Sequence, residues 1–347
     1  MADIAKAMSL LGECYGDIDA FGKKILTTYK TDGGINRNYA FHPGQTRLAE
    51  VHKDIVLCTA GNRSGKTSGI AKKHIYYAIY KIGVDNYLID DPEKWVSEPY
   101  QTLNASFEYN TAMKVFNFIV KLSRDNPLFK EGECFIEKIR LKDNSILWFN
   151  GAVTHFSSLD DKGKHIEGEG YHLISIDEIG YEQNLEDVYM TVIQPRTLDT
   201  NGITILAGTP KETQDPWVDA LYEQSKTSDD IEYVSISTEE NFYIPKEKID
   251  RMREKYKDYP ALQQMVFYGK LIPSSGRSLT GKQIENAIDP SIPNDPRDRF
   301  GKPTKRTPLM HGTQDRVEGH RYVSFWDIAM ETDWSVGITL DVTSLPF

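Results

Sequence analysis

The sequence has little cysteine, no long apolar run and no excess of positive charge, and each shortage narrows what the chain can be. Its three cysteines, Cys14, Cys58 and Cys134, are widely separated and lack metal-site spacing, so we expect reduced structural thiols. No apolar run reaches the roughly 18 residues of a membrane-spanning helix, and the N-terminus lacks the regions of a secretory signal. We therefore expect a soluble, intracellular protein.

The charge balance is acidic. Lysine and arginine total 41 against 51 for aspartate and glutamate, which gives a formal net charge of −10. Such a balance argues against a protein coated with basic surface for nucleic acid, although a local basic groove remains compatible with it. The 347 residues suffice for one large core and a second, smaller unit.

Apolar, β-rich runs alternate with helical patterns between residues 54 and 237. This alternation is typical of an α/β fold with a mainly parallel sheet and helices on both faces. Helices are predicted over 67–82 and 109–124, and a β-hairpin at the sheet edge over 135–149. The predicted strands are 55–59, 100–104, 153–157, 173–176, 203–207 and 233–236.

The most informative stretch runs from an apolar strand into the loop Gly61-Asn62-Arg63-Ser64-Gly65-Lys66-Thr67 and then into a helix. Small residues let backbone N–H groups surround phosphates, while Lys66 reaches the β/γ-phosphates and the Thr67 hydroxyl ligates Mg²⁺. Ala60 replaces the first glycine of the usual pattern, so in isolation a chance Gly-Ser-Lys turn is the alternative. The strand–loop–helix setting favours a nucleoside triphosphate site, with these residues and Ser68 as its nucleotide-binding set.

A second apolar strand ends in Asp177-Glu178. Asp177 is placed to hold the Mg²⁺ shell, and Glu178 to orient and deprotonate the attacking water. The alternative is a helix N-cap followed by an acid in the first turn. Two such elements in order, each on its own strand, favour ATP hydrolysis.

Two further segments could complete the site. Thr209 follows the strand 203–207, where a hydroxyl could sense the γ-phosphate and relay its loss, but a simple Gly-Pro turn explains the segment equally well. Upstream of the loop, Phe41-His42-Pro43-Gly44-Gln45 offers a glutamine amide that could read the adenine edge. By itself this last signal is weak.

Arginine can stabilise the charge that develops as the γ-phosphate is cleaved. Arg63, inside the loop, is the best candidate within the chain. A finger from a neighbouring subunit has Arg140, Arg196 and Lys164 as candidates, although surface ion pairs are the more ordinary use of each.

Near the end of the sequence, an apolar strand ends in Asp327, and Asp333 opens the next. Carboxylates presented in this way can bind the divalent metals of a phosphodiester-cleaving site. An ordinary hairpin with solvated acids is the alternative, and from these residues alone the favoured one.

Taken together, segments 41–45, 61–67, 176–178 and 208–210 resemble the large terminase subunit of tailed double-stranded DNA phages. Residues 268–270 with 274–277 are similar to the end of a terminase ATPase domain, and 326–335 to the opening of its nuclease domain. The resemblance covers nearly the whole chain from residue 41 onward. It implies a P-loop ATPase of the RecA/ASCE type that drives viral DNA into a procapsid, joined to an RNase H-like nuclease that cuts concatemers.

The resemblance also implies residue roles, cofactors and partners. ATP and Mg²⁺ would serve the motor, and Mg²⁺ or Mn²⁺ the nuclease. The implied partners are double-stranded DNA, the portal protein of the procapsid, the small terminase subunit and further copies of the chain in a ring, all in the host cytoplasm. The implied roles are adenine contact by Gln45, phosphate contact by Arg63 and Lys66, Mg²⁺ ligation by Thr67 and Asp177, base catalysis by Glu178, coupling by Thr209, and nuclease-metal ligation by Asp327 and Asp333.

Two departures from the family pattern limit this transfer. Ile166-Glu167-Gly168 stands where many terminases have an arginine before a glycine, which leaves the trans-acting finger unassigned. The remaining nuclease acids of the family would lie beyond Phe347, so this chain is expected to hydrolyse ATP but not to cut DNA.

The patterns and the resemblance divide the chain into successive parts. They are a helical lead-in (1–40), an ATPase core (41–245), a helical linker or lid (246–288), a proline-containing extended linker (289–320) and the start of the nuclease domain (321–347). Basic residues outnumber acidic ones in 296–321. A solvated linker is favoured there, with DNA contact as the alternative.

Three other functions compete with the packaging motor. A helicase-type translocase shares the phosphate loop and acidic pair, but would need a second RecA-like domain that the residues after 237 are too few and too charged to supply. A nucleotide-dependent scaffold would retain ATP without turnover, which Glu178 beside Asp177 argues against. A small-molecule kinase would be expected to show an acceptor-binding lid.

Overall fold

The computed structural model describes residues 2–28, 37–84, 100–124, 135–159, 166, 169–182, 184–211, 214–272, 322–327 and 336–341. They belong to two units, Met1–Ser278 and Leu279–Phe347, each described here by itself. The predicted linker 289–320 lies outside the described residues, as do Cys134, Lys164 and Asp333. Cys14 and Cys58 are buried free thiols, as expected.

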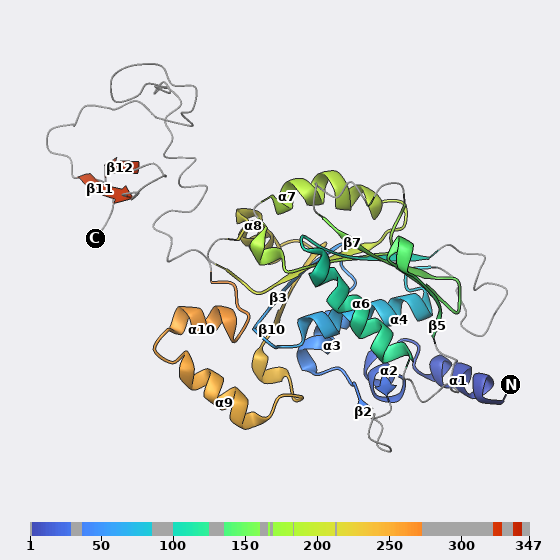
Figure 1. Cartoon of the computed structure of the whole chain (residues 1–347). Coiled ribbons are helices and arrows are strands. Elements are labelled where there is room, and N and C mark those ends of the chain that lie inside the picture. Colours follow the sequence, from blue (N-terminus) through green and yellow to red (C-terminus); the bar gives the residue numbers. More distant parts are fainter. Residues whose placement is uncertain are drawn as a thin grey trace. The chain divides into compact units, whose positions relative to one another are not determined.

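An eight-stranded sheet in the order β10-β3-β9-β8-β4-β7-β6-β5 forms the first unit (Figure 1). The strands from β10 to β7 run parallel, and β6 and β5 form an antiparallel hairpin at the edge. The predicted sheet and edge hairpin are therefore confirmed. The strand bounds are β3 (Ile55–Ala60), β4 (Gln101–Ser106), β5 (Ile136–Arg140), β6 (Ser145–Trp148), β7 (Val153–Ser158), β8 (Leu173–Asp177), β9 (Ile203–Gly208) and β10 (Ile231–Ile236).

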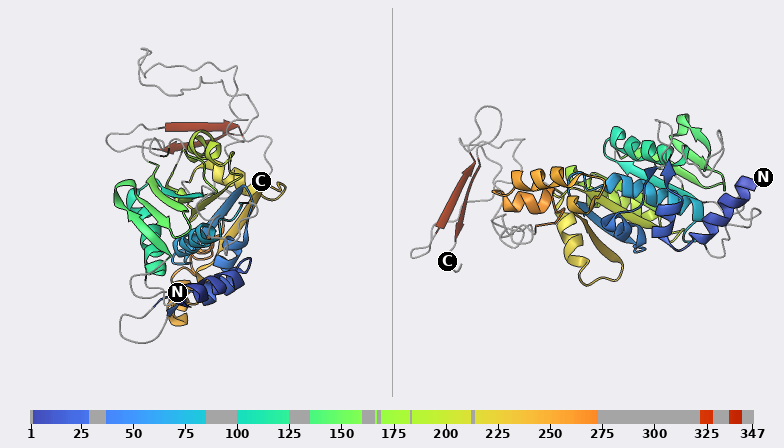
Figure 2. Two further views of the ribbon diagram at one scale, coloured as in Figure 1. Left: turned by 90° about the vertical axis from the view of Figure 1, so that its right-hand side faces the viewer. Right: turned by 90° about the horizontal axis from the view of Figure 1, so that it is seen from below.

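Helices cover both faces of this sheet (Figure 2). One face packs against α1 (Ala2–Glu13), α2 (Ile18–Lys24), α3 (Pro43–Glu50), α4 (Lys66–Tyr80) and α6 (Tyr109–Arg124), and the other against α7 (Leu185–Val188) and α8 (Pro216–Gln224). Successive side chains of a strand alternate between the two faces. Along β3, Val56 and Cys58 join the first apolar cluster while Leu57 joins the second, so the strand is buried on both sides.

The other elements are short. The chain after the sheet forms α9 (Lys246–Lys255) and α10 (Pro260–Val266), and β1 (Thr27–Thr28) pairs with β2 (Arg37–Asn38). Short 3-10 helices are η1 (Leu141–Asp143), η3 (Ile179–Tyr181), η5 (Gln194–Arg196) and η6 (Thr238–Glu240), whereas η4 (Tyr189–Ile193) is a wider π-helix. None of the described helices is both long and apolar enough to cross a membrane.

The second unit contains an antiparallel pair of strands, β11 (Tyr322–Asp327) and β12 (Val336–Asp341). β11 ends at Asp327, as the sequence pattern predicted, whereas β12 begins at Val336 and not at Asp333. Asp327 is the last residue of β11 and pairs in register with Val336, the first residue of β12.

A buried polar network joins α4 to the centre of the sheet. The ring nitrogens of His74 lie 2.7 Å from Ser175 Oγ on β8 and 3.1 Å from Thr102 Oγ1 on β4. The Ser175 hydroxyl donates to Asn104 Oδ1 at 2.9 Å, and Thr102 bonds the Thr154 hydroxyl on β7 at 2.9 Å. Because each member has a partner, the network fixes the position of α4. The first turn of this helix belongs to the phosphate site.

His74 should make the stability of the fold depend on pH. Burial, together with nearby Lys73, lowers the pKa of His74 to about 3. The unfolded imidazole titrates near pH 6.5, so between about pH 3 and 6.5 the unfolded state binds more protons and stability rises with pH. At pH 4.5 the loss is about 2 to 3 kcal/mol.

Urea unfolding of the wild type and of His74→Gln between pH 4.5 and 7 measures this effect. Glutamine keeps hydrogen-bonding groups at the site without the titration, so the variant's midpoint should fall less on acidification. His42 contributes with the same sign, because burial and Lys72 lower its pKa to about 4, and some pH dependence should remain. Parallel pH profiles for the two proteins would exclude His74 as the source.

Candidate nucleotide-binding site

The predicted phosphate loop joins the carboxyl end of β3 to the N-terminus of α4. Arg63 and Gly65 adopt positive φ angles of 63° and 93°, and Gly65 is the N-cap of α4. A Cβ atom on Gly65 would lie 2.9 Å from both His42 Nε2 and Gln45 Nε2, so only glycine fits without a shift. The first N–H groups of an α-helix lack partners within the helix, so those of α4 could bind an anion at this loop.

The structure brings the loop and the acidic pair together. The Lys66 ammonium forms an ion pair with Asp177 and lies 3.2 Å from Glu178 Oε1, while the Thr67 hydroxyl donates to Asp177 Oδ2 at 3.0 Å. Asp177 ends β8 and is fully buried, and its carboxylate also accepts the Glu178 N–H at 2.9 Å. Residues more than 100 positions apart in sequence therefore form one cluster.

Electrostatics keep Lys66 charged in this cluster. Burial lowers the pKa of Lys66, but the two carboxylates outweigh it and raise the pKa above the usual lysine value. The side chain is only 7% exposed. The protonated ammonium can therefore bind phosphate oxygens in place of the carboxylates.

The oxygens of Thr67 and Asp177 fit a magnesium ion. Mg²⁺ prefers oxygen ligands at about 2.0–2.1 Å in octahedral geometry, so two adjacent ligands lie about 2.9 Å apart. The observed separation of Thr67 Oγ1 and Asp177 Oδ2 is 3.0 Å. A hydroxyl and a carboxylate at this spacing could occupy neighbouring positions, with phosphate oxygens and water in the others.

Gln45 lies behind the loop, where its amide already has partners. Its Nε2 donates to the Gly65 carbonyl at 2.7 Å and to Ser68 Oγ at 2.8 Å, and its Oε1 accepts from Lys72 Nζ at 2.7 Å. The side chain is 1% exposed. Contact with adenine stays a prediction, and in this arrangement it would require some of these bonds to break.

The other predicted residues lie at different distances from the cluster. Thr209 directly follows β9, and its carbonyl packs against Gly180, where a Cβ would come within 2.6 Å of it. The Arg63 side chain is exposed at the loop. Arg140 ends β5, which five strands separate from β3, and the Arg196 guanidinium donates to the Ile166 and Val192 carbonyls.

The outer side of the loop is held by Thr238, Asn241, Val266 and Gly269, a contact that the sequence did not predict. The Thr238 hydroxyl donates to the Asn62 carbonyl and the Asn241 amide to the Arg63 carbonyl, both at 2.8 Å. The Asn62 N–H donates to the Val266 carbonyl at 2.6 Å. Gly269, with φ of 64°, packs so closely that a Cβ would lie 2.5 Å from the Gly61 nitrogen.

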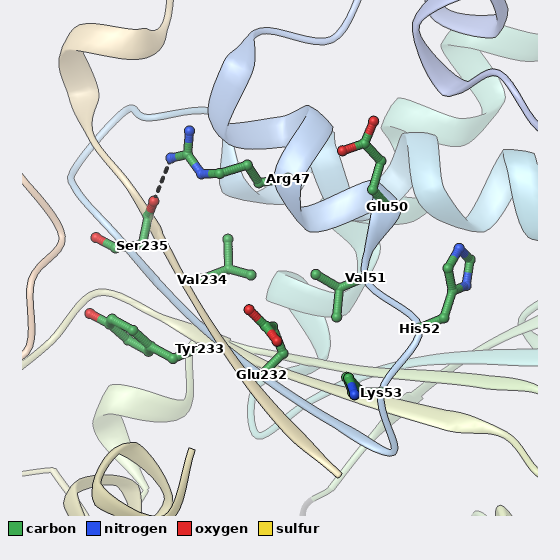
Figure 3. Close-up of a pocket in the computed structure, with 9 residues that line it drawn as sticks. All are labelled: Arg47, Glu50, Val51, His52, Lys53, Glu232, Tyr233, Val234 and Ser235. Atoms are coloured by element: carbon green, nitrogen blue, oxygen red, sulfur yellow. Dashed lines mark hydrogen bonds between the residues drawn. The ribbon is translucent and has the colours of Figure 1, made fainter. Parts of the chain in front are cut away.

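A pocket of about 490 Å³ lies apart from this cluster, between β10 and the end of α3 (Figure 3). Arg47 reaches across it and donates to the Ser235 carbonyl at 2.8 Å. Its walls carry Arg47 and Lys53 together with Glu50 and Glu232, so charges of both signs are present. No residue of the predicted nucleotide site lines it.

The parallel sheet, the loop after β3 and the acidic pair at the end of β8 define a P-loop NTPase fold. No protein-family model and no curated protein sequence matches the chain. A mutant of the large terminase ATPase domain of Thermus phage P74-26 aligns with a TM-score of 0.50 at 14% identity, covering 67% of this chain and 95% of that one. The HK97 bacteriophage large terminase aligns with a TM-score of 0.54 at 17% identity, covering 74% of this chain and 55% of that one.

These comparisons confirm the resemblance to large terminase ATPase domains at the level of the fold. The chain spans about half the length of the HK97 protein, since 55% of that chain is covered. Activity, substrates and partners are therefore matters for proposal.

Proposed function

We propose that this chain is the ATP-hydrolysing motor of a large terminase and translocates double-stranded viral DNA into a procapsid. The observation that carries the proposal is the convergence of Lys66 and Thr67 on Asp177 and Glu178 at one edge of the sheet. Phosphate-binding, metal-binding and base functions are thus within reach of one substrate. The likeness of the fold to terminase ATPase domains supports the choice of motor.

In the proposed reaction, each residue has a defined task. Lys66 leaves the carboxylates and binds the β/γ-phosphates of ATP. Thr67 and Asp177 would hold Mg²⁺, which would supply positive charge to neutralise the phosphate oxygens. The water oxygen bonds to the γ-phosphorus while the bond to the β,γ-bridging oxygen breaks and ADP leaves. Glu178 accepts a proton from this water, and Arg63 stabilises charge on the γ-phosphate. Thr209 transmits loss of the phosphate to the segment after Glu178, against which its carbonyl packs.

The wider assignment rests on the family resemblance. It includes the portal protein of the procapsid, the small terminase subunit and a ring of copies of this chain as partners. It also includes a nuclease whose metal would be held by Asp327 and Asp333. Asp327 ends β11 and Asp333 lies outside the described residues, so this part stays a prediction.

ATP turnover of the chain alone, with double-stranded DNA, and with DNA plus portal-bearing procapsids tests the proposal. We expect turnover that procapsids stimulate, and no strand separation of a partial duplex. Absence of ATP hydrolysis under all three conditions would refute the motor. Duplex unwinding without any response to procapsids would replace it with a helicase-type translocase.

A further inference from the structure

Phe242 presents an exposed aromatic ring beside the phosphate loop. Phe242 is 58% exposed, although its neighbour Asn241 is buried. Its ring lies edge-to-face with His42, with centroids 6.2 Å apart, and packs against Tyr243 at 4.6 Å. Burial of apolar surface is favourable, so a ligand that covered this ring would gain binding free energy.

The loop that carries Phe242 is held rigidly. Ser237 and Glu240 form a reciprocal capping box around η6, and Arg47 binds the Glu240 carboxylate through two nitrogens at 2.7 and 3.0 Å. On the other side of Phe242, the Tyr243 hydroxyl donates to the Ala40 carbonyl at 2.8 Å. The ring therefore extends from a preorganised support, and binding against it would lose little conformational entropy.

The position of Phe242 suits the nucleoside part of a bound triphosphate. The adjacent residue Asn241 donates to the Arg63 carbonyl, and the ring contacts His42, whose Nε2 approaches the Gly65 position. Gly65 opens α4, where the phosphates would be bound. A base leaving the phosphate site on this side would meet the Phe242 ring.

Gln45 is poorly placed to read that base. Both of its amide donor bonds go to Gly65 and Ser68, and its carbonyl oxygen is bonded to Lys72. The bonds to Gly65 and Ser68 tie α3 to the first turn of α4. Its amide thus acts on the shape of the loop, which is the work of a positioning residue.

We propose that Phe242 is the stacking surface for the base of the nucleoside triphosphate, and that Gln45 positions the phosphate loop instead of reading adenine. The inference rests on the proposed nucleotide hydrolysis. Stacking uses the π-face that every base has, so it holds purine nucleotides without selecting between them. The site should accordingly bind ATP and GTP with similar affinity.

Equilibrium binding of ATP, GTP and tripolyphosphate to the full 347-residue chain tests this assignment. Phe242→Ala should weaken ATP and GTP binding by about tenfold each, as expected for loss of a base–aromatic stack, and leave tripolyphosphate binding within about twofold. Phe242→Trp keeps an aromatic face and should bind ATP and GTP about as tightly as the wild type does. Tyr259→Ala, which removes a comparably exposed aromatic (63%), is the matched control and should change none of the three affinities.

Gln45→Ala separates positioning from adenine reading. If Gln45 shapes the loop, ATP, GTP and tripolyphosphate should all weaken by the same factor. A loss confined to ATP would overturn the positioning role, and ATP affinity unchanged in Phe242→Ala would overturn the stacking role. Failure of the wild type to bind any triphosphate would instead refute the proposed function itself.

Discussion

Replacing Glu178 by glutamine is expected to reduce ATP turnover at least a hundredfold and to leave ATP binding nearly intact. A positioned general base contributes about 10²- to 10⁴-fold to rate, and the amide cannot accept the proton of the attacking water. Glu178 is the first residue after β8, with 33% of its side chain exposed and one carboxylate oxygen 3.2 Å from Lys66. Glu178 is thus on the solvent-accessible side of the cluster, whereas Asp177 is fully buried within it.

The backbone at Glu178 supports this role independently. Its φ of 64° and ψ of 39° place a non-glycine residue in the left-handed region. Such conformations are strained and persist where the surrounding structure holds them, often at functional sites. Here the Asp177 carboxylate accepts the Glu178 N–H at 2.9 Å and thereby helps to hold the strained turn.

Steady-state turnover and equilibrium ATP binding, measured on the same preparations, check the prediction. Glu186→Gln is the matched control, because it removes an exposed carboxylate eight residues further on, in the first turn of α7, and should keep wild-type turnover. Unchanged turnover in a folded Glu178→Gln protein would remove Glu178 from the catalytic role and return the scaffold interpretation to consideration.

Much of the fold follows from local patterns. Every predicted strand of the sheet is present within about two residues of its expected ends, and the 109–124 helix has its predicted bounds. The meeting of Lys66 with Asp177 also follows from sequence, because parallel strands end at a common edge. The phosphate loop and the acidic pair can each be identified from the residues of one strand and the segment that follows it, without knowledge of long-range contacts.

Side-chain direction and long-range packing could not be predicted in the same way. The Gln45 amide forms its hydrogen bonds with Gly65, Ser68 and Lys72, and only the packing of α3 against α4 brings these residues to it. Thr238 and Asn241 can bond the loop carbonyls because β10, the last strand of the sheet in sequence, pairs with β3. No local periodicity encodes such a pairing.

The second large effect is expected at Lys66. Lys66→Met should weaken ATP binding at least about a hundredfold, because charge-assisted hydrogen bonds to the phosphates are lost. It should also destabilise the nucleotide-free protein by about 2 to 4 kcal/mol, because the fully buried Asp177 carboxylate loses its counter-ion. The Thr67 hydroxyl and the Glu178 N–H still bond that carboxylate, which keeps the loss below the upper range for a broken buried pair.

A double variant separates the two effects. Lys66→Met with Asp177→Asn removes both charges together, so most of the lost stability should return in urea unfolding, while ATP binding and turnover stay lost. The pairwise interaction energy from the four proteins then reports the ion pair itself. If Lys66→Met were as stable as the wild type, or if the double variant recovered none of the loss, the Lys66–Asp177 pair would not be what balances the buried acid. Groups other than Lys66 would then compensate the charge of the Asp177 carboxylate. The proposed transfer of Lys66 from carboxylate to phosphate would lose its basis.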